Sequence, residues 1–281
     1  MKILLIAPYI NLNYDRSVSH VNREDFYPSA ALIHLAAILR ANNYEVSILD
    51  FNNSEVHSKE EKYLEYSKEE IIKSLNEFKP DLVGLNCLFS GSWPDVLEFA
   101  KLVKNHSQDF KVATGGIHPT TFPKEILKNC MEIDYVAIGE GENSIVALSA
   151  SIDQNKPELL KSIKSFAFRD DKGVVHINRL KNYVDDLGTL PMPAWDLIDM
   201  NKFKMDLDHY YNPTETKIGK FKAAIFSSRA CPLACNFCDM FLVMGKKHRK
   251  RTIKAIIDEI ELLHKEYGVN YFSFMDDQMT L

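Results

Sequence analysis

The sequence contains no apolar run that approaches the roughly 20 residues needed to span a bilayer. Residues 1–6 do not resemble a signal peptide, because they carry one charged side chain, a very short apolar core and no small-residue cleavage site. Positive charge is not in excess either, since 34 Lys and Arg stand against 39 Asp and Glu. We interpret the one basic run, residues 246–251, as a solvated surface, the alternative being that it grips a phosphate or carboxylate. These absences predict a protein with no membrane span and no nucleic-acid partner.

A disulfide framework is also missing. The five cysteines are odd in number and three of them lie within eight residues, a pattern that favours a reducing compartment and predicts a cytoplasmic protein. With 281 residues, 46% hydrophobic and 26% charged, the chain has the composition of a globular protein. It is long enough for one large or two medium domains.

The first half of the chain alternates short apolar segments with helical patterns. Such strands, separated by helices, predict a parallel sheet covered on both faces. Right-handed crossovers would make residues 1–151 a doubly wound, Rossmann-like or flavodoxin-like α/β domain. The first strand is not followed by G-x-G-x-x-G, so a dinucleotide-binding interpretation loses its main support. The predicted strands cover residues 2–7, 46–51, 81–88, 111–114 and 135–138.

The pattern changes after this domain. Residues 152–222 are predicted to be a linker that carries a small hairpin, with its turn at Asp170-Asp171-Lys172-Gly173. Residues 223–281 predict a strand, a loop, an amphipathic helix over 253–263 and a second strand over 271–275. Two strands do not make an independent domain.

Three cysteines, Cys231, Cys235 and Cys238, follow the strand at residue 223 in the spacing C-x3-C-x2-C. Three thiolates leave a tetrahedral metal site one ligand short, so a zinc or iron–sulfur centre held in this way keeps an open position. His248 is the only candidate nearby in the sequence for a fourth zinc ligand.

Further candidates follow the predicted strands, at the carboxyl ends where parallel sheets bind ligands. Gly115-Gly116 would let a ligand approach the backbone or would form a tight turn. The acids of Gly139-Glu140-Gly141-Glu142 would contact a ligand or cap a helix. His118 is either a ligand contact or structural, and Asp276-Asp277 would bind a cation or an amine or begin a loop. Cys87 and Cys130 are expected to be buried.

At the cysteine loop the sequence resembles the radical S-adenosylmethionine (SAM) superfamily, whose signature is C-x3-C-x-aromatic-C, with Phe237 in the aromatic place. Other segments resemble the cobalamin-binding branch of that family, in order along nearly the whole chain. They are Pro28-Ser29-Ala30-Ala31-Leu32, Gly115-Gly116-Ile117-His118-Pro119, Gly139–Glu142, the connector Leu190–Asp196 and the strand Phe272–Asp277.

The resemblance implies three cofactors: a 4Fe-4S cluster, SAM and cobalamin. The three cysteines would ligate three irons, the fourth iron would bind SAM, and the reduced cluster would cleave SAM to a 5'-deoxyadenosyl radical. Methyl transfer to an unidentified substrate is the usual chemistry, with an electron donor such as a flavodoxin or ferredoxin. The implied SAM contacts are Phe237 and Asp276 or Asp277. The implied cobalamin contacts are Asn86, Leu88, Gly115, Gly116, His118, Gly139, Glu140, Gly141 and Glu142.

The sequence departs from the family in two ways. The loop from Pro8 to Asn13 has no Asp-x-His-x-x-Gly, so no histidine is offered as a lower cobalt ligand. Residues 223–281 are too few for a radical SAM barrel, which needs roughly 200 residues, so we expect an incomplete barrel and a fragment inactive alone. Two alternatives stay open: a non-catalytic cobalamin-binding module and a zinc protein that uses the three cysteines and His248.

Overall fold

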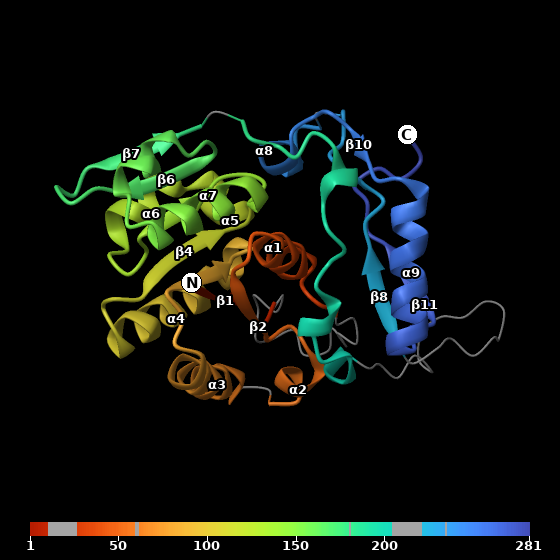
Figure 1. The fold of residues 1–281 in the computed structure, drawn as a ribbon, viewed down its shortest axis with the longest axis horizontal. Helices are drawn as coiled ribbons and strands as arrows, with labels where there is room; N and C mark the ends of the chain where they lie inside the picture. The colour runs from red at the N-terminus through yellow and green to blue at the C-terminus, as the bar shows by residue number, and fades with distance from the viewer. Residues whose placement is uncertain (11–26, 60–61, 180, 204–220, 234) are drawn as a thin grey trace.

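A seven-stranded sheet forms the centre of the protein (Figure 1). The computed structural model describes residues 1–10, 27–59, 62–179, 181–203, 221–233 and 235–281. The strands lie in the order β2-β1-β3-β4-β5-β6-β7, and the first five are parallel. Their bounds are β1 Lys2–Ala7, β2 Glu45–Asp50, β3 Leu82–Asn86, β4 Lys111–Gly115, β5 Tyr135–Ala137, β6 Phe166–Arg169 and β7 Val175–Asn178.

The five parallel strands confirm the predicted doubly wound α/β domain, and their order 2-1-3-4-5 is the flavodoxin-like one. Strand β1 shows why the sheet is covered twice. Successive side chains of a strand point to opposite faces, and here Leu4 and Ile6 join one apolar core while Ile3 and Leu5 join the other. All four are buried, so the strand has no polar face.

Helices cover both faces of this sheet. Helices α3, α4 and α6 pack on the first core, and α1 and α7 on the second. The helices of this half are α1 Ala30–Ala41, α2 Ser54–His57, α3 Tyr63–Phe78, α4 Trp93–His106, α5 Ile117–Thr121, α6 Pro123–Asn129 and α7 Glu142–Asp153.

The predicted hairpin exists, but it extends the main sheet rather than standing in a linker. Strand β6 pairs antiparallel with β5, and β7 pairs antiparallel with β6. Phe166 and Phe168 of β6 are buried in the second core, and the burial of these two side chains stabilises the hairpin against the sheet. The proposed division of the chain at residues 151 and 222 stays a prediction.

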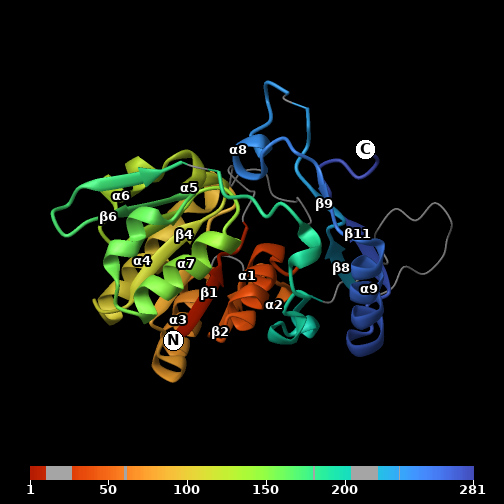
Figure 2. The ribbon, with the colours of Figure 1, turned by 45° about the horizontal axis from the view of Figure 1, so that its top comes forward.

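The last part of the chain lies beside the sheet, with residues 181–203 running between the two (Figures 1 and 2). Strands β8 (Lys222–Ile225) and β11 (Tyr271–Phe274) are parallel, and α9 (Ile253–Tyr267) connects them through Gly268. Two short strands, β9 (Ser228–Arg229) and β10 (Arg249–Lys250), pair antiparallel, and α8 spans Met240–Met244 between them. Among the described residues, no helix is both long and apolar enough to cross a membrane.

Candidate functional site

Paired glycines shape the carboxyl edge of the sheet. The amide of Cys87 donates to the carbonyl oxygen of Gly115, 2.8 Å away, so the ends of β3 and β4 stay together. Gly116 has a φ of +116°, and a Cβ placed on it would lie 2.3 Å from the carbonyl oxygen of Cys87. Only glycine fits at this position, because any side chain would push the two strand ends apart.

An apolar rim, Leu88, Phe89 and Phe122, lies beside these glycines, with each side chain between 38% and 42% exposed. The ring of His118 of α5 lies at a tilt of 48° to the ring of Phe122, with centroids 5.1 Å apart, and its Nδ1 lies 2.9 Å from the hydroxyl of Ser90. Burial lowers the pKa of His118, which favours the neutral imidazole. The structure therefore brings Asn86, Leu88, Gly115, Gly116 and His118 to one edge of the sheet.

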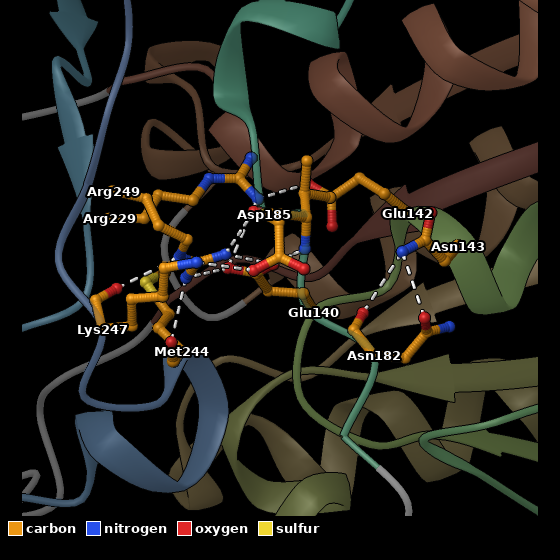
Figure 3. Close-up of polar contacts among 10 residues, drawn as sticks. Glu140, Glu142, Asn143, Asn182, Asp185, Arg229, Met244, Lys247 and Arg249 are labelled. Carbon is orange, nitrogen blue, oxygen red and sulfur yellow. Dashed lines mark hydrogen bonds and ion pairs between the residues drawn. The ribbon is translucent and has the colours of Figure 1, made fainter.

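The glutamates of the Gly139–Glu142 segment are buried and bound to arginines from the last part of the chain (Figure 3). Arg249 donates to both carboxylate oxygens of Glu140, at 2.6 and 2.8 Å. Arg229 lies 2.7 Å from Glu142. Burial alone would raise the pKa of Glu142, but the charge and hydrogen bond of Arg229, together with a backbone hydrogen bond and His34, make the net effect a lowered pKa. Whether these acids also contact a cofactor stays a prediction.

The basic run is therefore only partly the solvated surface that we expected. Lys246 and Lys247 are exposed, but Arg249 and Arg251 are not: Arg249 is 4% exposed, and Arg251 lies 2.5 Å from the buried carboxylate of Glu259. The interpretation as a solvated surface is wrong for these two arginines. Buried charges need partners, and the run does grip carboxylates, those of its own chain.

The cysteine loop lies between β9 and α8. Cys231, Cys235 and Cys238 are half-buried, and Phe237 is 93% exposed. Within the described residues, no three or more His, Cys, Asp or Glu side chains are placed to hold a metal ion. His248, the alternative zinc ligand, has its Nε2 3.0 Å from the carbonyl oxygen of Gln278. Cys87 and Cys130 are buried, as predicted.

Asp276, one of the predicted SAM contacts, lies at the end of β11 and is bonded to two serines that precede the cysteine loop. The carboxylate of Asp276 accepts hydrogen bonds from the amide and hydroxyl of Ser227 and from the hydroxyl of Ser228. It thereby ties the end of β11 to the segment that leads into the cysteines. Burial and the charge of Asp276 raise the pKa of Asp277.

A family model described as the B12 binding domain matches residues 18–149, which include β2 to β5 and the glycines Gly115 and Gly116. Residues 18–149 are a B12-binding domain. The flavodoxin-like strand order described above agrees with this assignment.

Relatives are found over the whole chain. An uncharacterized methyltransferase of Pyrococcus horikoshii is 30% identical over all of this chain and 54% of its own length. The cytidylyl-2-hydroxyethylphosphonate methyltransferase of Streptomyces wedmorensis is 28% identical over 99% of this chain and 55% of its own length. The chain thus spans about half the length of these relatives.

A solved structure extends the likeness in fold. The cobalamin-dependent S-adenosylmethionine radical enzyme OxsB, with aqua-cobalamin and S-adenosylmethionine bound, has a TM-score of 0.72 at 19% identity. The match covers 99% of this chain and 34% of that enzyme. The predicted likeness to cobalamin-binding radical SAM proteins is confirmed in fold, and in sequence for the B12-binding domain.

The carboxyl edge of the B12-binding domain fits cobalamin, a large and partly apolar macrocycle. The glycines Gly115 and Gly116 leave the edge without side chains, and the apolar rim next to them is exposed. A cavity of about 280 Å³ opens at the end of β5, between Thr120 of α5, Gly139, Tyr183 and Leu242 of α8. A larger hollow of about 560 Å³ lies against the β6–β7 hairpin, away from this edge.

Sequence reasoning missed His34, Arg229 and Arg249 as residues near this site. His34 lies on α1, where burial, and then the positive charge of Arg229, lower its pKa to about 3, so the imidazole is neutral. These residues had no sequence signal of their own, because their partners lie far away along the chain. The one available clue was the pair of acids in Gly139–Glu142, which required a cation if buried.

Proposed function

We propose that the B12-binding domain holds cobalamin at its carboxyl edge, and that Cys231, Cys235 and Cys238 hold a 4Fe-4S cluster that binds SAM. The chemistry would be that of a cobalamin-dependent radical SAM enzyme, with methyl transfer to an unidentified substrate as the leading reaction. The observation that carries the proposal is the packing of α8 against α5. Helix α5 follows Gly116, and α8 follows Cys238, so the two proposed cofactor sites are neighbours.

The residues of the B12-binding domain would act by shape and by excluding water. Gly116 lets the ends of β3 and β4 lie close together, with no side chain at that point of the edge. Leu88, Phe89 and Phe122 offer apolar surface that a bound macrocycle would bury, at about 25 cal/mol for each Å² removed from water. His118 is hydrogen-bonded to Ser90 and its ring packs at a tilt against Phe122, so these two contacts orient the imidazole.

The donor set of the cysteine loop fits an iron–sulfur cluster, because thiolates are the usual ligands of such clusters. When bound, cobalamin would supply a methyl carrier, and the cluster with SAM would supply radical chemistry. Three protein ligands would leave one iron without a protein ligand, as binding of SAM requires. Asp276, held by Ser227 and Ser228, fixes the strand end beside the loop.

Two binding experiments test the proposal. Hydroxocobalamin should be retained by the full chain through gel filtration, with a shift of its visible spectrum. Anaerobic reconstitution with iron and sulfide should give a brown protein with about four irons per chain, lost in Cys235→Ala and kept in Cys130→Ala, because Cys130 is a buried cysteine outside the loop. A colourless zinc adduct in place of the brown protein would contradict the cluster.

A second candidate function is a cobalamin-binding module without turnover. It is favoured by one observation: within the described residues, the three thiols are not gathered for a metal ion. Cleavage of SAM by the reconstituted and reduced chain separates the two candidates. Cleavage lost in Cys235→Ala supports the enzyme, whereas bound cobalamin with no cleavage supports the module.

A further inference from the structure

Two arginines face each other at the base of the cysteine loop. Strands β9 and β10 close this loop, and their register places Arg229 directly opposite Arg249. Like charges directly opposite each other in an antiparallel pair repel. Both side chains are also largely buried, with 12% and 3% of their surface exposed, so water screens this repulsion poorly.

Glu140 and Glu142 neutralise this pair, and both come from the B12-binding domain. The planar head of Arg249 uses all five of its N–H groups, on both oxygens of Glu140 and on the carbonyl oxygens of Val184, Met244 and Lys247. One side chain therefore joins the segment after β5, the segment of residues 181–203, the end of α8 and the segment after it. Arg229, two residues before Cys231, forms an ion pair with Glu142, with its Nη1 2.7 Å from one carboxylate oxygen (Figure 3).

Two glycines let the backbones come close enough for these contacts. Gly139 has a φ of +75°, and a Cβ placed on it would lie 3.0 Å from the carbonyl oxygen of Val243 in α8. Gly245 has a φ of +73°, and a Cβ there would lie 2.8 Å from the ring of Tyr183. Each side of the contact thus has a position where a side chain would hold the loop away from the domain.

We propose that the ion pairs Glu140–Arg249 and Glu142–Arg229 form a clamp that fixes the position of the cysteine loop over the carboxyl edge of the B12-binding domain. The four residues are positioning residues, because they act through the loop rather than on a substrate. Resting on the proposed function, the clamp would set how the cluster lies relative to cobalamin. The clamp itself is a property of the chain and exists without either cofactor.

The structure also supplies a matched control. Asp185 and Lys247 form an ion pair between the segment of residues 181–203 and the segment after α8, with nitrogen and oxygen 3.0 Å apart, but both side chains are more than 70% exposed. An exposed pair of this kind contributes little to stability. Asp185→Asn therefore removes a charge from the same contact without touching the clamp.

Hydrogen exchange in the full chain, measured by mass spectrometry, tests the clamp. In Glu140→Gln and in Glu142→Gln, the amides between Ser228 and Arg251 should exchange about tenfold faster or more, because a buried arginine loses its partner. In Asp185→Asn they should exchange at the wild-type rate. The affinity for hydroxocobalamin, from an absorbance titration, should stay within about twofold of the wild-type value in Asp185→Asn.

Three results would overturn the clamp. One is wild-type exchange of the loop in both glutamine variants. The second is equal acceleration in Asp185→Asn. The third is a fall in cobalamin affinity as steep as the rise in exchange, which would make the carboxylates cobalamin contacts instead. A wild-type chain that binds no cobalamin would contradict only the proposed function, since the exchange measurement needs no cofactor.

A milder variant keeps the test possible if the glutamine variants do not fold. If the glutamine variants lose their far-ultraviolet circular dichroism, Arg229→Lys keeps the charge but lacks the planar fork that suits a carboxylate. The loop should again exchange faster than in the wild type, with the sheet unchanged. Wild-type exchange in Arg229→Lys would overturn the clamp.

Discussion

The indole Nε1 of Trp195 donates a hydrogen bond to the buried carboxylate of Glu259, 2.9 Å away. Trp195 belongs to the proline-rich connector and Glu259 to α9, so this bond fastens the connector to the last helix. The other oxygen of Glu259 accepts from Arg251, and the carboxylate is therefore satisfied from both sides.

Replacing Trp195 by phenylalanine should lower the free energy of unfolding by about 1–3 kcal/mol, because it leaves one oxygen of a buried carboxylate without its donor. Urea unfolding followed by circular dichroism measures the change. Trp93→Phe is the control, since Trp93 is the only other tryptophan in the chain, belongs to α4 and packs against the ring of His118. Equal stability of Trp195→Phe and wild type would contradict the importance of this bond.

The carboxyl of Asp50, at the end of β2, should make stability depend on pH. Burial raises its pKa to about 6, although the backbone amides of Ser29 and Asn52 donate to it and oppose the shift. The native state then holds a proton that the unfolded chain, with a pKa near 3.8, has lost. Stability from this group therefore falls as pH rises from about 4 to 6, by about 3 kcal/mol in total.

In Asp50→Asn this fall should disappear. The measurement is the free energy of unfolding in urea at several pH values between 4 and 7. Asp109→Asn, an exposed carboxyl changed in the same way, should keep the wild-type slope. The assignment to Asp50 fails if the slope survives in Asp50→Asn.

Substitution of Gly116 should damage the proposed cobalamin site. In Gly116→Ala, the new Cβ would meet the carbonyl oxygen of Cys87 and the backbone would be held at a positive φ, at a cost of about 1–3 kcal/mol or more. We expect loss of hydroxocobalamin binding in an absorbance titration. Gly173→Ala is the control, because Gly173 also has a positive φ but has no atom within 4 Å of the added Cβ. Equal binding by both variants would count against a cobalamin site at this edge.

The five cysteines should react with iodoacetamide in two classes. Burial raises the pKa of Cys87 to about 12 and also raises the pKa of Cys130, so both are protonated at neutral pH. The three loop cysteines are partly accessible. Mass spectrometry should find them labelled at least about a hundredfold faster, because the thiolate is the reactive species. After reconstitution with iron and sulfide the same three should be protected, and labelling of Cys87 as fast as Cys231 would contradict the burial.

The sheet could be predicted from the sequence because local pattern determines it. Strand β1 is apolar at every position from Ile3 to Ala7, and Pro80 and Gly116 stand close to strand ends. The pairing of β6 with β5 could not be predicted in this way. Both a free hairpin and a docked one have the same alternation, and only the burial of Phe166 and Phe168 on the domain decides between them.

The same distinction applies to the candidate site, where local pattern predicts some positions and contacts between distant segments determine the others. The positions of Gly115, Gly116 and His118 at one edge follow from strand ends, which sequence pattern predicts. The partners of Glu140 and Glu142 do not, since Arg249 is 109 residues away from Glu140. The sequence of a basic run does not show which of its side chains will be buried. For this reason the sequence predicts Arg249 and Arg251 to be exposed like their neighbours.

The strand order determines how the sheet can assemble while the chain is being synthesised. Each strand after β2 adds to the outer edge of the sheet that the earlier strands have already made, from β3 through β7. The sheet can therefore grow in the direction of translation, with no strand held back for a later partner. Glu140 and Glu142 are the exception: they are made with the sheet but meet Arg229 and Arg249 only later, so docking of the last segment is the step at which their charges leave water.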